Sequence, residues 1–109
     1  MTDDETPWCA AFANAMLAEA GIRGTDRANA RSFERWGEAV ADPREGDIVV
    51  FWRTDPSSWK GHVGFFVRFE VRGDRSGVVV VGGNQSNAVS EAWYPISRLL
   101  AFRRASPPR

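Results

Sequence analysis

Hydrophobic residues recur with a helical period in the first third of this chain and with a strand period after it. Over residues 7–20 the apolar positions follow helical spacing, and Gly21 can cap the helix end in a left-handed conformation. A second helix is expected over about 27–36, with Thr25 or Asp26 as its N-terminal cap. Its apolar face would carry Ala30, Phe33 and Trp36, and its solvent face Arg27, Arg31, Glu34 and Arg35.

Strand patterns begin at residue 48. A nearly continuous apolar run there is typical of a central strand covered on both faces. Several shorter runs follow, separated by turn-forming residues, so the pattern predicts an α+β fold with helices packed on an antiparallel sheet of about five strands. The expected strands cover about residues 48–52, 62–71, 78–81, 88–94 and 99–103, after an irregular connection at 38–46.

The strand expected over 62–71 shows strict alternation. One face reads Val63, Phe65, Val67, Phe69 and Val71, and the other reads His62, Gly64, Phe66, Arg68 and Glu70. The face of His62 is apolar at its start, so a helix could cover its first half, and Gly64 would let that helix come close. If a hairpin turns near Gly73, the numbers of facing residues sum to about 146, which sets Asn84 opposite His62 on the same face. A slip of one residue would move Asn84 to the other face.

Composition narrows the function classes. A chain of 109 residues forms one domain, residues 1–109, whose ends at 1–5 and 105–109 are expected to be flexible. Fourteen basic residues balance fourteen acidic ones, which argues against electrostatic capture of nucleic acid or an anionic membrane. No run is long enough for a membrane span, and the acidic start is unlike a signal peptide. One cysteine cannot form an internal disulfide, and one cysteine with one histidine cannot build a zinc site from Cys and His alone.

Cys9 lies at the start of the first expected helix. Thr6 suits the N-terminal cap and Pro7 the first helical position. Unpaired backbone N–H groups at a helix N-terminus favour thiolate over thiol, so this position suits a nucleophile. The alternative is a core residue, because Cys9 also lies on the apolar stripe of the helix and single cysteines are often buried.

A nucleophilic cysteine needs a base within hydrogen-bond reach and a third group that orients the base. His62 is the only histidine, and Gly61 and Gly64 beside it indicate that another part of the chain comes close. Asn84 follows two glycines in the polar segment 82–87. The alternatives are a structural histidine and an ordinary polar turn.

Four motifs together, in this order, resemble the NlpC/P60 and CHAP peptidases, and most closely their small phage-associated members. They are Pro7-Trp8-Cys9-Ala10-Ala11-Phe12, Gly46-Asp47-Ile48-Val49-Val50-Phe51, Gly61-His62-Val63-Gly64-Phe65-Phe66 and Gly82-Gly83-Asn84-Gln85. The likeness covers about residues 6–104 and implies a papain-like fold that cleaves amide bonds in peptidoglycan. By position it implies Cys9 as nucleophile, His62 as base and then acid, and Asn84 as orienting residue with Gln85 as its substitute. It implies no cofactor, and the acidic calcium loops of some relatives have no counterpart in this sequence.

Tryptophans are the candidates for substrate contacts, because five of them exceed what a small core needs. Trp59 is the strongest, since it lies in a polar loop just before His62. Each tryptophan has packing as its alternative role. The other candidates are Trp8, Trp52, Trp93 and the amide of Gln85.

The expected function is a cysteine hydrolase of bacterial cell-wall peptidoglycan, either an endopeptidase or an N-acetylmuramoyl-L-alanine amidase. Synthesis in the cytoplasm without a signal peptide would fit a lysin released through a membrane pore or a toxin delivered by a secretion apparatus. A delivery partner or an immunity protein would then be expected beside the peptide stem as substrate. Three other classes stay open: an acyltransferase or deamidase on another amide, a non-catalytic peptide-binding module, and a structural or inhibitory partner protein.

Overall fold

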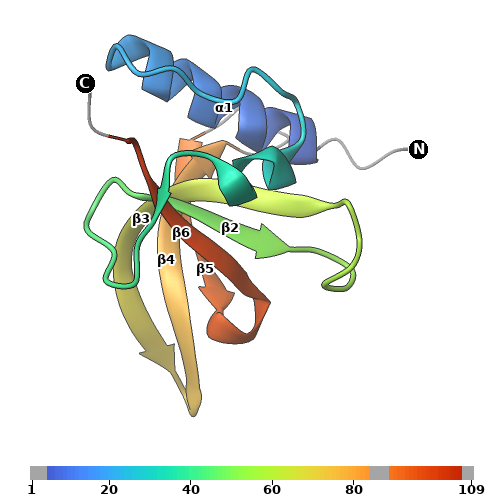
Figure 1. Cartoon of the computed structure of the whole chain (residues 1–109). Helices are drawn as coiled ribbons and strands as arrows, with labels where there is room; N and C mark the ends of the chain where they lie inside the picture. The colour runs from blue at the N-terminus through green and yellow to red at the C-terminus, as the bar shows by residue number, and fades with distance from the viewer. Residues whose placement is uncertain (1–4, 84–88, 107–109) are drawn as a thin grey trace.

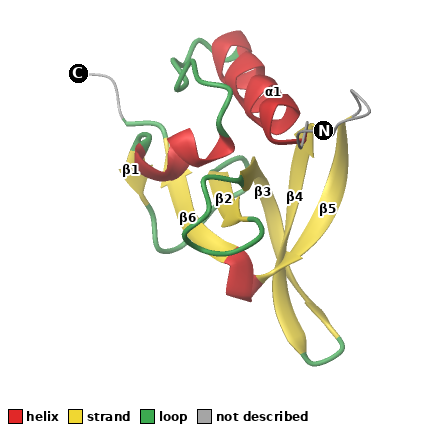
Figure 2. Ribbon diagram, turned by 90° about the vertical axis from the view of Figure 1, so that its right-hand side faces the viewer, coloured by secondary structure: helices red, strands yellow, loops and turns green. Residues whose placement is uncertain are grey.

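The computed structural model describes residues 5–83 and 89–106 as one helix packed on a six-stranded antiparallel sheet (Figure 1). The sheet has the order β1-β6-β2-β3-β4-β5, and the β3–β4 hairpin extends away from α1 (Figure 2). The helical elements are α1 (Glu5–Glu19), the 3₁₀ turns η1 (Ala30–Arg35) and η2 (Ile96–Arg98). The strands are β1 (Glu38–Ala39), β2 (Ile48–Trp52), β3 (Gly61–Arg72), β4 (Arg75–Gly83), β5 (Val89–Pro95) and β6 (Leu99–Arg104).

The α+β class with an antiparallel sheet is confirmed, with six strands in place of about five. The additional strand is β1, two residues within the segment expected to be irregular, where Glu38 pairs with Arg104 and Ala39 with Arg103. Two residues are too few to show a period in the sequence. The first helix begins at Glu5, so Thr6 lies inside it and the prediction of Thr6 as cap is wrong.

The predicted second helix is reduced to the 3₁₀ turn η1, capped by Asn29 and not by Thr25 or Asp26. The carboxamide oxygen of Asn14 on α1 accepts hydrogen bonds from the backbone N–H of Thr25 at 2.8 Å and of Asp26 at 3.3 Å. Asp26 also has φ of 58°, in the left-handed region. These contacts tie the segment to α1, so a helix cannot start there. Ala30 and Phe33 are buried as predicted.

Two apolar clusters cover the two faces of the sheet. On the α1 face, Cys9, Ala10 and Ala13 pack with Val50 and Val63. On the opposite face, the cluster comprises Val49, Phe51, Phe66, Val78 and Val80. Successive residues of β2 thus alternate between the two clusters, as a central strand covered on both faces requires. The expectation that a helix covers the His62 face is wrong, because α1 packs on the face of Val63.

The hairpin register agrees with the prediction at Phe65↔Val81 and Phe66↔Val80. An irregularity between Phe66 and Arg68 then shifts the pairing by one residue, and beyond it Phe69 pairs with Val78. The strict alternation predicted for this strand therefore fails past Phe66. The rings of Phe66 and Phe69 lie 5.1 Å apart, although the alternation placed them on opposite faces.

A buried ion pair fastens the start of β2 to the end of β6. Asp47 is only 7 % exposed, and its two carboxylate oxygens accept hydrogen bonds from Arg104 Nε at 2.8 Å and Nη2 at 2.7 Å. Burial alone would raise the pKa of Asp47, but the bonds from Arg104 and from the Arg44 N–H, with both arginine charges, hold that pKa below its ordinary value. Asp47 is thus ionised in the folded protein at neutral pH.

Replacing Asp47 by Asn is expected to lower the free energy of unfolding near neutral pH by about 2 kcal/mol, because the charge-assisted bonds to Arg104 are lost. Urea unfolding measures this, with Glu45→Gln, an exposed site nearby, as the matched control. The difference from wild type should shrink as the pH falls below the ordinary Asp pKa of 3.8, where the native carboxylate is protonated. Equal stability of both variants at neutral pH would contradict this role.

Candidate active site

Cys9 lies in the first half of α1, on the side that packs against the sheet, and its side chain is fully buried. Its neighbours in the core include Ala10, Ala13 and Val63. The predicted place on the apolar stripe of the helix is therefore confirmed. The predicted place in the first turn is not, because α1 begins at Glu5 and Cys9 is its fifth residue.

His62 lies at the start of β3 and is 7 % exposed. Phe51 faces it across the β2–β3 pair, with ring centroids 6.4 Å apart. The ring of Tyr94, on β5, stacks on the imidazole at 4.8 Å with an angle of 29° between the planes. The contact with Tyr94 was not predicted from the sequence, because it joins strands that are distant in the chain.

Burial, and to a smaller extent the positive charge of Arg53, together lower the pKa of His62 from its ordinary value of 6.5 to about 4. The imidazole is therefore neutral at neutral pH. A neutral imidazole can accept a proton, which is what a general base must do. Arg53, the residue directly after β2, is another residue of this site that the sequence did not single out.

Cys9 packs against one face of the sheet, and the side chain of His62 lies on the opposite face. Val63 belongs to the cluster of Cys9, whereas His62, its neighbour along the strand, shares the other face with Phe51. The helix α1 and the imidazole of His62 approach the same dipeptide at the end of β4. A Cβ atom on Gly83 would lie 2.8 Å from Cβ of Phe12 on α1, and one on Gly82 would lie 3.5 Å from His62 Nε2. Gly83 thus lets α1 come close to this strand, whereas a Cβ on Gly82 would be in ordinary van der Waals contact with the imidazole.

The two glycines beside His62 are also crowded. A Cβ on Gly64 would lie 2.9 Å from Cγ2 of Val80 on the neighbouring strand, not against a helix as expected. A Cβ on Gly61 would lie 2.6 Å from Cγ of Arg31. The prediction that another part of the chain comes close is confirmed, and its identity at Gly61 is the stem of Arg31. Asn84 and Gln85 fall outside the described residues, so their assigned roles stay predictions.

The tryptophans divide by exposure. Trp59 is 63 % exposed in the loop before β3, and Trp8 is 37 % exposed on α1. Trp52 is half-buried and donates its Nε1–H to the Ser97 carbonyl at 3.2 Å. Trp93 is also half-buried and donates to the Glu70 carbonyl at 2.9 Å. Trp59 and Trp8 thus present the larger open ring surfaces, whereas Trp52 and Trp93 are half-buried and each is held by a hydrogen bond.

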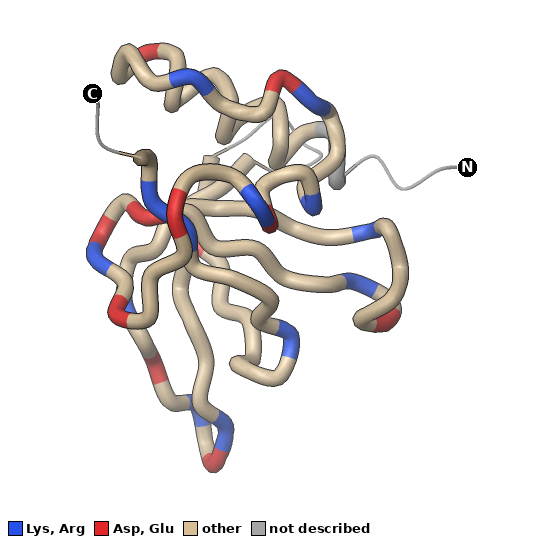
Figure 3. Tube along the Cα trace, in the orientation of Figure 1, with Lys and Arg blue, Asp and Glu red and all other residues tan. Residues whose placement is uncertain are grey.

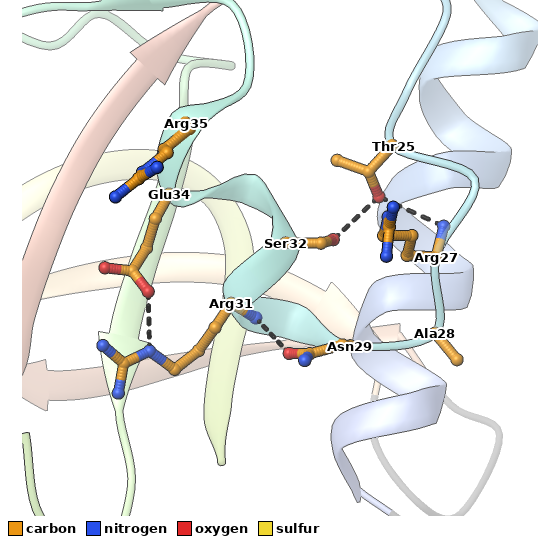
Figure 4. A pocket seen from close by; sticks show the side chains of 8 residues that line it. All are labelled: Thr25, Arg27, Ala28, Asn29, Arg31, Ser32, Glu34 and Arg35. Carbon is orange, nitrogen blue, oxygen red and sulfur yellow. Dashed lines mark hydrogen bonds and ion pairs between the residues drawn. The ribbon is translucent and has the colours of Figure 1, made fainter. Parts of the chain in front are cut away.

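A hollow of about 830 Å³ lies along η1, and neither Cys9 nor His62 lines it (Figure 4). It is lined by Thr25, Arg27, Ala28, Asn29, Arg31, Ser32, Glu34 and Arg35.

Basic and acidic positions occur side by side in most loops of the described chain (Figure 3). Within residues 5–83 and 89–106, no cluster of three His, Cys, Asp or Glu side chains could hold a metal ion. No helix in these ranges is long and apolar enough to cross a membrane.

The depressed pKa of His62 predicts an acid-dependent loss of stability. His62 takes up a proton near pH 6.5 in the unfolded chain and only at about pH 4 in the folded chain. The free energy of unfolding is therefore unaffected by this group above pH 6.5 and falls as the pH drops between these values. From about pH 7.5 to about pH 4.5 this single group should remove roughly 2 to 3 kcal/mol. Urea unfolding of wild type and His62→Gln across this range isolates the effect, because the variant lacks the group. Parallel stability curves would contradict the prediction.

A family model described as the CHAP domain matches residues 1–84, a segment that includes Cys9, His62 and Asn84. No curated protein and no solved structure matches the chain. CHAP domains are typically hydrolases that act on peptidoglycan. Because the match covers well over half of the residues, the chain belongs to the CHAP family.

Proposed function

We propose that this protein is a cysteine hydrolase of papain-like type that cleaves amide bonds of bacterial peptidoglycan, as an endopeptidase or as an N-acetylmuramoyl-L-alanine amidase. One observation carries the proposal: the CHAP match contains the only cysteine and the only histidine of the chain. These are the two residue types that a thiol nucleophile and its base require.

In this reaction His62 accepts the proton of the Cys9 thiol, and the thiolate sulfur attacks the carbonyl carbon of the substrate amide. The C–N bond then breaks, and the leaving amine takes the proton from the imidazolium of His62. Water, deprotonated by His62, hydrolyses the remaining thioester to a carboxylate and restores the thiol. Asn84, or Gln85 in its place, would orient the imidazole, and backbone N–H groups near the start of α1 would stabilise the oxyanion.

The neutral state of His62 supports its role as base at neutral pH. The burial of Cys9 sets a requirement for the same reaction. The sulfur, a nitrogen of His62 and the substrate carbonyl must come within hydrogen-bond or attack distance. Productive binding therefore includes displacement of the groups that cover the sulfur.

Substrate contacts are proposed for the exposed rings of Trp59 and Trp8, since aromatic faces bind the apolar faces of sugars and peptides. Trp52 and Gln85 are the further predicted contacts. Trp59 lies closest in sequence to His62, and the cation of Lys60 is 5.9 Å from the centroid of its ring. Action on the cell wall after release or delivery, with a delivery partner or an immunity protein, belongs to the same proposal.

A second function has its own support. The complete burial of Cys9, and the placement of His62 on the opposite sheet face, favour a peptide-binding module that holds the stem peptide without cleaving it. An acyltransferase or deamidase would use the same chemistry with a different acceptor or amide. Mass analysis of the products from purified peptidoglycan separates these classes, because only hydrolysis releases fragments with a new carboxylate and a new amine.

Replacing Cys9 by Ala is expected to abolish the release of fragments from purified peptidoglycan, because the sulfur forms the covalent intermediate. The fold should persist, since Ala fits the small-residue face of α1 and removes one buried atom. Mass spectrometry measures the fragments, and circular dichroism with urea unfolding checks the fold.

Ala13→Ser, a substitution at a neighbouring buried position, is the control for general disturbance of α1. It should lower stability and leave some hydrolysis, because the nucleophile is retained. Undiminished hydrolysis by Cys9→Ala would eliminate this mechanism. Binding of peptidoglycan without hydrolysis by wild type would support the binding module.

A further inference from the structure

We propose that Arg31 is a positioning residue that fixes the loop between β2 and β3, residues 53–60, and the start of the strand that carries His62. Its consequence for catalysis rests on the proposed hydrolase function. Arg31 was expected on a solvent face, and that expectation is wrong: its side chain is only 16 % exposed. Two of its hydrogen-bond partners, the carbonyl groups of Pro56 and Ser58, lie more than twenty residues further along the chain.

The head of Arg31 binds the loop directly. Its Nη1 donates hydrogen bonds to the carbonyl oxygens of Pro56, at 2.9 Å, and of Ser58. Donors from a charged guanidinium make stronger hydrogen bonds than neutral groups. Two adjacent stretches of the loop backbone are therefore held by one side chain.

The other contacts of the side chain hold it to η1. Arg31 Nε donates to Glu34 Oε2 at 2.7 Å, as the dashed line in Figure 4 shows. Asn29 caps the start of η1 by accepting from the Arg31 backbone N–H at 2.8 Å. Ala30 and Phe33 anchor the turn in the core. Arg31 thus connects the loop 53–60 to η1, which is anchored by its buried residues.

The stem of Arg31 packs on the residue before His62. A Cβ on Gly61 would lie 2.6 Å from Arg31 Cγ and 2.7 Å from the Phe51 carbonyl oxygen. Gly61 is therefore enclosed between β2 and the arginine stem. The backbone position from which His62 extends is set by the same contact.

The loop that Arg31 holds carries two residues that bear on the proposed site. Trp59 is its exposed ring, and Arg53 at its start lowers the pKa of His62 through its charge. The Arg53 N–H donates to the Lys60 carbonyl at 3.2 Å, which closes the loop at its base. Loss of Arg31 would therefore displace Trp59, a proposed substrate contact, more than it would alter the chemistry of Cys9.

The test compares Arg31→Ala and Arg31→Lys with Arg35→Ala, an exposed arginine of η1 that is the matched control. In full-length Arg31→Ala, amide hydrogen exchange over residues 54–61 should be faster by about tenfold or more, since two charge-assisted bonds are lost. Arg31→Lys should be intermediate, because one ammonium cannot reproduce the paired contacts of a guanidinium. Arg35→Ala should match wild type.

The second measurement is hydrolysis of purified soluble peptidoglycan fragments. Arg31→Ala should raise KM by about fivefold to tenfold with kcat within about twofold, because substrate contact is lost and the nucleophile is kept. Exchange over 54–61 that is unchanged in Arg31→Ala, or equally changed in Arg35→Ala, would overturn the proposal. If Arg31→Ala does not fold, Glu34→Gln and Arg31→Lys replace it, and unchanged exchange in both would overturn it equally.

The exchange measurement does not depend on activity. If wild type hydrolyses nothing, the proposed function fails while the exchange result still decides whether Arg31 positions the loop. If wild type hydrolyses peptidoglycan and Arg31→Ala lowers kcat with KM unchanged, the proposal that Arg31 positions the substrate-binding loop is wrong, even though the hydrolase function stands.

Discussion

The close contact between α1 and the sheet is the constraint on which the rest of the structure depends. Cys9, Ala10 and Ala13 are fully buried, and each has a side chain of at most two heavy atoms. At the end of β4, Gly83 leaves the space that Phe12 occupies. Larger side chains at these positions would push the helix outward, and the sulfur would move with it. The position of the single thiol is thus a consequence of how tightly this helix packs.

Burial also decides the resting charge of His62. Removing water disfavours the ionised form of an imidazole. His62 accordingly has a pKa of about 4, and it is enclosed by Phe51 and Tyr94. A neutral imidazole is the starting state that these surroundings favour, and in the proposed reaction it accepts the proton of the Cys9 thiol.

The sequence pattern predicted those features of the fold that residues close together in the chain determine. The run of β2 and the register at Phe65↔Val81 could be read from apolar periodicity and a turn near Gly73. The prediction of a second helix failed because Asn14 on the preceding helix α1 holds the backbone of Thr25. The predictions that a helix covers the face of His62 and that Arg31 lies on a solvent face failed likewise. Both features are settled by packing between segments far apart in the sequence. In the site, the crowding at Gly61 was predictable from its residue type, but its partner was not.

Peptide mapping after an acid quench tests the central claim most directly. Wild type mixed with soluble stem-peptide fragments is stopped within the first turnover, digested and analysed by mass spectrometry. The account predicts that the peptide containing Cys9 carries the acyl part of the substrate as a thioester, and that hydroxylamine removes it. Turnover without any adduct on that peptide would contradict the account.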